Sequence, residues 1–92
     1  MNFTITDWCV YSALYGEYQL PKDGEGIVFG EFHSHIDIFN GREEHTGKIQ
    51  KFYFDTVEDC SVVVTNAGNI YKLKDMRRSY KNWVLAHVQS DS

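Results

Sequence analysis

The chain has 92 residues, of which 42% are hydrophobic, 15% aromatic and 24% charged, a composition typical of one small folded domain. At this length folding buries only about 60% of the unfolded surface, which leaves room for one core but excludes a deep internal substrate cavity. No apolar run reaches the roughly 20 residues that cross a bilayer, and the first residues lack the pattern of a signal peptide. We therefore expect a single cytoplasmic domain, residues 1–92, that is a binding module and not an enzyme.

Charge is distributed unevenly along the chain. Residues 1–60 carry a net charge of −7 and residues 61–92 one of +3, which gives −4 overall. The acidic part opposes general binding to phosphates, because each nearby carboxylate offsets a released counterion. Cys9 and Cys60 lie far apart without a partner at C-x-x-C spacing, so we expect both to be reduced core residues and expect no cofactor.

The first segment of the chain allows two interpretations. Phe3 and Ile5 alternate with polar residues as in a strand, whereas Thr6 and Asp7 are suited to cap a helix that Gly16 would end. The alternation favours the strand.

The most regular pattern runs from Ile27 to Phe39. Its even-numbered positions are apolar or small and its odd-numbered positions carry most of the polar side chains, which predicts a strand with one face buried. Asn40-Gly41 then predicts a tight turn, or a longer loop if the polar residues 42–45 extend it.

Three further elements follow. A strand is expected from about Lys48 to Asp55, where the apolar positions do not keep one parity, so it contains a bulge or has two buried sides. Residues 60–65 and 70–73 predict a hairpin around the turn at 66–69. Ser79 is predicted to cap a short helix with an apolar stripe. Together these elements predict a mainly β, α+β fold: a small, antiparallel, partly open barrel, SH3-like, with a short C-terminal helix.

Aromatic side chains are more numerous than so small a core can enclose, so some are expected at a protein interface. The outward side of the strand at 27–39 combines aromatic and acidic residues, which suits a partner with a basic surface. The predicted partner-binding residues are Phe29, Glu31, His33, His35, Asp37 and Phe39.

Two alternatives remain open. His33, His35 and Asp37 share a strand face at the spacing that metal ligands need, so a metal-dependent site is one of them. The other is a nucleic-acid-binding barrel that combines base stacking with basic side chains. Its candidate residues are Tyr71, Lys72, Lys74, Arg77, Arg78 and Lys81.

Residues around Gly30 to Gly41, Thr46 and Ile49, and the hairpin T-N-A-G-N-I-Y-K-L at 65–73 form one further pattern. In this pattern the chain resembles a group of short uncharacterised β-rich proteins of bacteria and their phages, which carry T-x-S-G-x-x-Y-x-L at the hairpin. The sequence departs from their G-H-P and F-x-D-G segments, with Ile36 in place of the proline and Asn40 in place of the aspartate.

This resemblance implies a compact module in a mobile-element setting, where many short proteins inhibit host defence complexes such as CRISPR effectors. We therefore expect a phage-encoded or prophage-encoded inhibitor that contacts a host protein complex with a basic, nucleic-acid-binding surface. No membrane partner and no direct nucleic-acid partner are expected, and a homodimer is an open alternative.

Overall fold

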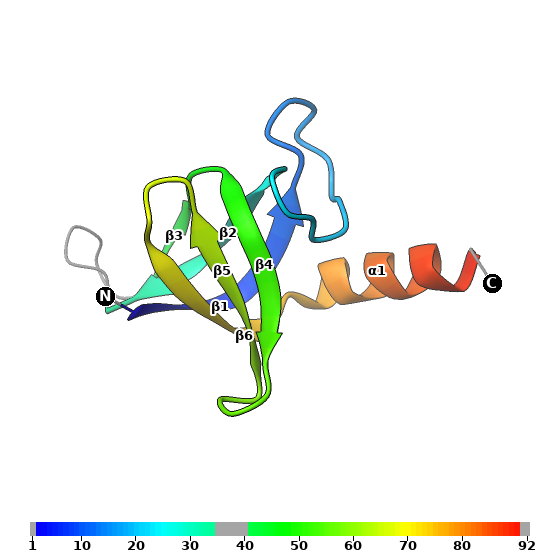
Figure 1. Cartoon of the computed structure of the whole chain (residues 1–92). Helices are drawn as coiled ribbons and strands as arrows, with labels where there is room; N and C mark the ends of the chain where they lie inside the picture. The colour runs from blue at the N-terminus through cyan, green and yellow to red at the C-terminus, as the bar shows by residue number, and fades with distance from the viewer. Residues whose placement is uncertain (1, 35–40, 91–92) are drawn as a thin grey trace.

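The structure is a computed structural model that describes residues 2–34 and 41–90 (Figure 1). In the described residues, six strands form one strongly curved sheet, and a single helix leaves it at the C-terminal end. The elements are β1 (Asn2–Tyr11), β2 (Ile27–His33), β3 (Arg42–His45), β4 (Ile49–Asp55), β5 (Cys60–Thr65), β6 (Ile70–Met76) and α1 (Arg78–Ser90). The fold is thus mainly β with a C-terminal helix, and the expectation of a strand at the N-terminus is confirmed.

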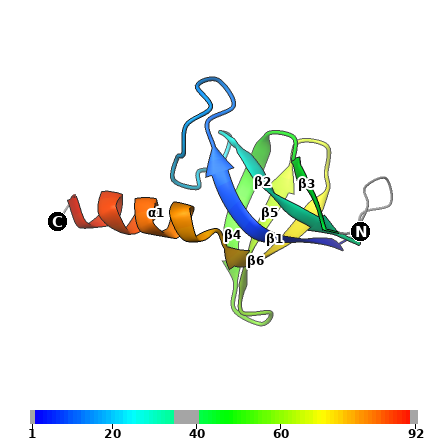
Figure 2. The same ribbon diagram turned by 180° about the vertical axis from the view of Figure 1, so that it is seen from behind.

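The strand order is β3-β2-β1-β6-β5-β4, so β3 and β4 are the two edges of an open sheet. These two edges follow each other in the chain through Thr46, Gly47 and Lys48, and backbone hydrogen bonds from Thr46 N to Val28 O and from Ile49 N to Gly26 O hold the connection against the start of β2. The sheet therefore curls into a partly open barrel. Figure 2 shows the same curvature from behind, with α1 extending away from the body.

One strand pair departs from the antiparallel arrangement predicted for the barrel. β1 and β6 run parallel, in a register from Asn2 opposite Ile70 to Trp8 opposite Met76, while the other neighbouring pairs are antiparallel. Parallel neighbours need a long crossover between them. The whole segment from β2 to β5 provides it here, and it brings the first and last strands together in the middle of the sheet.

The core lies on the concave side of the sheet. β2 alternates as predicted, with Val28, Gly30 and Phe32 buried and its other residues half-buried. The remaining core side chains come mainly from β1, β5 and β6: Phe3, Ile5, Trp8, Cys9, Val10, Val63, Tyr71 and Leu73, joined by Ile49 and Tyr80. Burial of this apolar surface is the main source of stability.

A bulge interrupts β1 at Asp7. The backbone of Asp7 has a φ of 52°, and the register to β2 shifts between Thr6 and Cys9. Gly30 on β2 faces this bulge, and a Cβ placed there would lie 2.8 Å from the Thr6 carbonyl oxygen and 2.6 Å from Ile5 Cγ2. The bulge aims Trp8, Cys9 and Val10 all into buried positions, and it requires glycine at position 30.

The structure differs from the sequence-based expectations at two further places. Residues 42–45, expected in a turn or loop, form β3 and pair with β2 from Phe29 opposite His45 to Phe32 opposite Arg42. β2 ends at His33 and Ser34 has a φ of 64°, so the long strand expected up to Phe39 is shorter, and positions 35–40 lie outside the described residues.

The predicted helix is present, but Ser79 does not cap it. The helix begins at Arg78, and the first helical hydrogen bond runs from Lys81 N to Arg77 O at 2.8 Å. The Ser79 hydroxyl instead shares a 2.8 Å hydrogen bond with the Tyr18 hydroxyl. Within the described part of the chain, no helix is long and apolar enough to span a bilayer.

An aromatic cluster attaches α1 and the loop at 12–26 to the sheet. The ring of Tyr80 lies 5.8 Å from Trp8, 5.2 Å from Tyr18 and 5.9 Å from Trp83, measured between centroids. The Tyr80 hydroxyl donates a 2.6 Å hydrogen bond to the Gln19 carbonyl oxygen. Burial, together with the nearby Cys9 thiol, raises the pKa of the Tyr80 phenol well above its ordinary value.

Candidate interaction surfaces

The predicted partner face on β2 is largely occupied by contacts within the chain. Phe29 is half-buried beneath the guanidinium of Arg77, which lies 5.2 Å from the ring centroid. Nε2 of His33 is 2.9 Å from the Thr6 hydroxyl oxygen. Glu31 is half-buried opposite Glu43 of β3. The other three predicted residues, His35, Asp37 and Phe39, lie outside the described residues.

Arg77 holds two carboxylates at this face. Its Nη2 is 2.9 Å from Glu43 Oε1 and 3.3 Å from Asp7 Oδ2, and its side chain is only 18% exposed. The backbone N–H of Arg77 also donates a 2.8 Å hydrogen bond to the backbone carbonyl oxygen of Trp8. Arg77 therefore ties the β1 bulge, the edge strand β3 and the start of α1 together, and we call Asp7, Phe29, Glu43 and Arg77 the Arg77 latch.

The latch encloses a thiol. Cys9 is fully buried, and burial raises the pKa of its thiol, although the charge of Arg77 opposes this effect. A thiol in such surroundings behaves as a small apolar core residue. Both cysteines are free and buried, as expected from the sequence.

The metal alternative gains no support from the described residues. Among them, no group of three or more histidine, cysteine, aspartate or glutamate side chains is arranged to hold a metal ion. Of the three proposed ligands only His33 is described, and its Nε2 is engaged with Thr6.

The basic residues proposed for nucleic acid separate into two groups. Tyr71 lies in the core at 3% exposure, so it is not available for base stacking. Lys72 pairs with Glu58 at 3.3 Å, and Arg77 belongs to the latch. Only Lys74, Arg78 and Lys81 are exposed and make no ion pair within the described residues, too few for an extended phosphate-binding surface.

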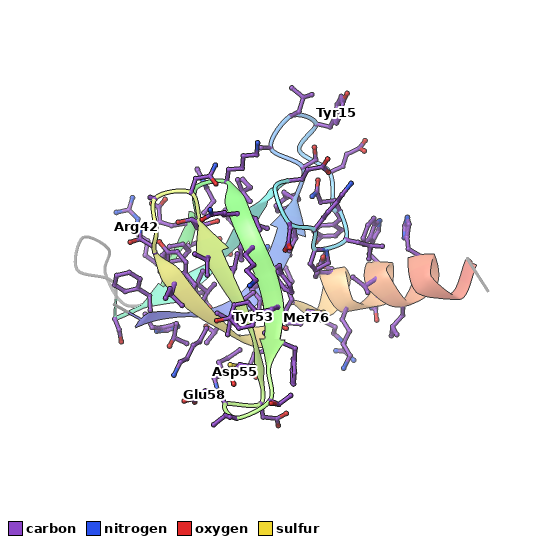
Figure 3. All side chains as sticks on the ribbon, viewed as in Figure 1. Tyr15, Arg42, Tyr53, Asp55, Glu58 and Met76 are labelled. Carbon is purple, nitrogen blue, oxygen red and sulfur yellow. The ribbon has the colours of Figure 1, made fainter. Side chains whose placement is uncertain are left out.

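The clearest exposed apolar surface lies elsewhere, on the hairpin between β4 and β5. Val57 is 91% exposed, Phe54 57% and Tyr53 39%. Figure 3 shows Asp55 and Glu58 near the end of this hairpin, which projects beyond the rest of the sheet, and Tyr53 farther up on β4. We call Tyr53, Phe54, Asp55, Val57, Glu58 and Asp59 the hairpin tip.

The turn of the hairpin tip is built to hold one shape. Oδ1 of Asp55 accepts hydrogen bonds from the backbone N–H of Val57 at 2.9 Å and of Glu58 at 3.1 Å. Asp59 then takes a φ of 55°, a left-handed conformation that aspartate tolerates better than most residues. Because the backbone of the turn is already fixed, it loses little conformational entropy when a partner binds, which favours recognition.

The charge of the hairpin tip is acidic. Three carboxylates, Asp55, Glu58 and Asp59, lie in the same hairpin as the exposed Val57 and Phe54, and only Glu58 has an ion-pair partner among the described residues, Lys72. An apolar centre with an acidic rim is complementary to a basic protein surface that contains a small apolar hollow.

A second exposed apolar surface lies at the far end of the molecule, on the loop at 12–26. Leu14 is 79% exposed and Tyr15 75%, beside a hollow of about 290 Å³ that Gln19, Glu25 and Lys48 also line. Tyr15 appears at the top of Figure 3. This surface carries mixed charges, so its electrostatics do not indicate one kind of partner.

Comparison with known proteins adds no relative from which a function could be taken. No protein-family model matches the chain, and neither a curated protein nor a solved structure is significantly similar to it.

Proposed function

We propose that this chain is a non-enzymatic binding module that inhibits a nucleic-acid-handling defence complex of a bacterial host by protein–protein contact. Two separate arguments support the proposal. The resemblance to short phage proteins suggests the mobile-element setting and the class of target. The geometry suggests the means of contact, and it favours the hairpin tip over the β2 face predicted from the sequence.

The observation that carries the proposal is the exposed, acidic hairpin tip. Phe54 at the end of β4 and Val57 on the adjoining fixed turn are exposed, and the neighbouring carboxylates match the basic groove in which a nucleic-acid-handling protein holds phosphates. The β2 face is less suitable, since Phe29 is covered by Arg77 and Glu43 is already neutralised by it.

The inhibitor function is tested by phage plating on a bacterium with an active RNA-guided defence system. Expression of the wild-type chain is expected to restore plaque formation. Val57→Asp combined with Phe54→Ser is expected to abolish this protection, whereas the matched surface variant Leu14→Asp with Tyr15→Ser is expected to retain it. Failure of the wild-type chain in the host that carries its gene would overturn the proposal.

The contact surface is tested separately by site-specific photo-cross-linking. A benzoylphenylalanine at position 57 is expected to cross-link to a subunit of the defence complex, while the same probe at Leu85 on α1 is not. Protection by the chain together with cross-linking only from position 85 would keep the inhibitor function but reject the hairpin tip.

A further inference from the structure

The free edge of β4 carries a sequence that is complementary to itself. β4 is the last strand of the sheet and pairs with β5 on one side only. Lys51, Tyr53 and Asp55 lie opposite Val64, Val62 and Cys60 of β5, and their side chains share one face of the sheet. Phe52 and Phe54 occupy the other face. The positive Lys51 thus lies two residues before Tyr53 and the negative Asp55 two residues after it.

We infer that β4 is the docking site for β4 of a second copy of this chain, in an antiparallel pairing with the two-fold axis at Tyr53. In this register Lys51 lies opposite Asp55 of the second copy, and Asp55 opposite its Lys51. On the other face of the sheet, Phe52 of each copy lies opposite Phe54 of the other copy. Opposite charges and aromatic pairs directly across from each other stabilise an antiparallel ladder.

The register is selected by charge. A two-residue shift in one direction places Lys51 opposite Tyr53, and a shift in the other direction places it opposite Val57, so neither charge pair forms. Shifts by one residue would bring side chains onto opposite faces. The sequence Lys51 to Asp55 therefore specifies a single symmetric arrangement, and a closed two-fold dimer follows from it.

The backbone of the edge points the right way for this pairing. The N–H of Phe52 donates to Asp23 Oδ1 at 2.7 Å and thus points away from β5. Because the direction alternates along an antiparallel strand, Phe54 also directs its N–H and carbonyl groups toward the free edge. The end of β4 projects together with β5 beyond the rest of the sheet, and its outer side is the edge (Figure 1).

The contact from Asp23 competes with the dimer. An edge strand is commonly protected against pairing by a covering loop or charge, and the Asp23 carboxylate covers one N–H of β4 in this way. Dimer formation must release Phe52 N–H from Asp23. We therefore expect weak self-association in the wild-type chain and a tighter dimer when Asp23 is replaced by alanine.

Sedimentation equilibrium on the purified chain at low salt tests the arrangement. Lys51→Glu and Asp55→Lys are each expected to weaken self-association about tenfold, because each replaces two attractive pairs by two repulsive ones. An equimolar mixture of the two variants restores both charge pairs and is expected to associate again. Lys81→Glu, the same charge change at an exposed position of α1, is the matched control and is expected to have little effect.

Asp55→Lys also removes the hydrogen bonds that hold the turn, so a second test detects the dimer through a disulfide and does not use that variant. The two-fold axis places residue 53 opposite itself in a non-hydrogen-bonded pair, where the Cα atoms are about 4.5 Å apart and within the range of a disulfide. Tyr53→Cys is therefore expected to form a covalent dimer on mild oxidation, much faster than the control Thr56→Cys. Equal rates for the two variants, or an Asp23→Ala chain that stays monomeric, would overturn the inference. Both assays use the isolated chain, so their outcome is independent of the defence-complex proposal.

Discussion

The Arg77 latch and the hairpin tip both gather carboxylates, but they use them in different ways. In the latch, Asp7 and Glu43 meet one guanidinium that is only 18% exposed, so their charge serves to hold three elements together. In the hairpin tip, three carboxylates lie beside exposed apolar side chains and only one of them has an ion-pair partner in the described chain. The comparison shows that an acidic cluster indicates a binding surface only if its carboxylates are not already paired with basic side chains of the same chain.

Removing the guanidinium should break the latch. Arg77→Ala leaves Asp7 and Glu43 without their cation and uncovers Phe29, and we expect it to lower the free energy of unfolding by about 1–2 kcal/mol, because the guanidinium is largely buried but its two carboxylates are about half exposed and can be hydrated instead. Chemical denaturation measures the change. The adjacent, exposed Arg78→Ala is the matched control and should change stability by less than about 0.5 kcal/mol. Equal effects of the two substitutions would show that the latch is an ordinary surface ion pair.

The latch can also be disturbed without changing a charge. A methyl group at position 30 would contact the Thr6 carbonyl oxygen at 2.8 Å and displace the bulge that carries Asp7. We expect Gly30→Ala to reduce the stability by about 2 kcal/mol, as overpacking of a close contact does. Gly47→Ala meets nothing within 4 Å and serves as the control in the same thermal melts. A stable Gly30→Ala chain would contradict the role assigned to the close approach.

A third change removes a hydroxyl that is buried without an ion pair, that of Tyr80. Tyr80→Phe removes the hydrogen bond to Gln19 O, which should cost about 1 kcal/mol at neutral pH. Because burial raises the pKa of Tyr80 in the folded chain, the unfolded chain loses this proton first as the pH rises above about 10. Its contribution to stability is therefore complete below that pH and is lost above it.

Denaturation at a series of alkaline pH values tests this dependence. The wild-type chain should lose stability more steeply above about pH 10 than the Tyr80→Phe variant does. Tyr53→Phe, a change at an exposed tyrosine of the hairpin tip, is the control. The same alkaline slope in wild type and Tyr80→Phe would show that Tyr80 does not contribute to it.

The smallest expected effect concerns nucleic acid. The triple variant Lys74→Ala, Arg78→Ala, Lys81→Ala removes the exposed bases, and Arg77 and Lys72 are held by carboxylates. We expect the wild-type chain to bind oligonucleotides only weakly and the triple variant to reduce the salt dependence of this binding by at most about one unit for each basic side chain removed. Fluorescence anisotropy across a salt series measures it. Tight binding at physiological salt would instead support the nucleic-acid alternative.

The sequence predicted the elements whose apolar pattern is regular. The alternation of Val28, Gly30 and Phe32 and the β-branched run at 60–65 both indicate strands, and the structure confirms them. β3 was missed because Arg42 to His45 has no apolar alternation. It is a polar edge strand held by backbone pairing with β2, and backbone pairing alone does not require the apolar alternation that marks a strand in the sequence.

The hairpin tip was missed for a related reason. The bulge between Ile49 and Lys51 breaks the parity of β4, so Phe52 packs against Trp8 while Phe54 lies beyond the end of the core on the same side. Phe52 and Phe54 are two residues apart, so alternation in the sequence treats them alike and does not show that only Phe52 reaches the core. The latch was equally hidden, since Asp7 and Arg77 are brought together only by the parallel pairing of β1 with β6.

That parallel pairing also determines when the protein is able to fold during synthesis. β1 forms ladders with β2 on one side and with β6 on the other, so one of its two partner strands leaves the ribosome long after β1 itself. Contacts between such distant segments close large loops and slow the folding. A nascent chain that ends before Ile70 exposes an unpaired edge of β1 and an uncovered core. The domain therefore completes its fold only after translation has passed β6, and until then it depends on protection from aggregation.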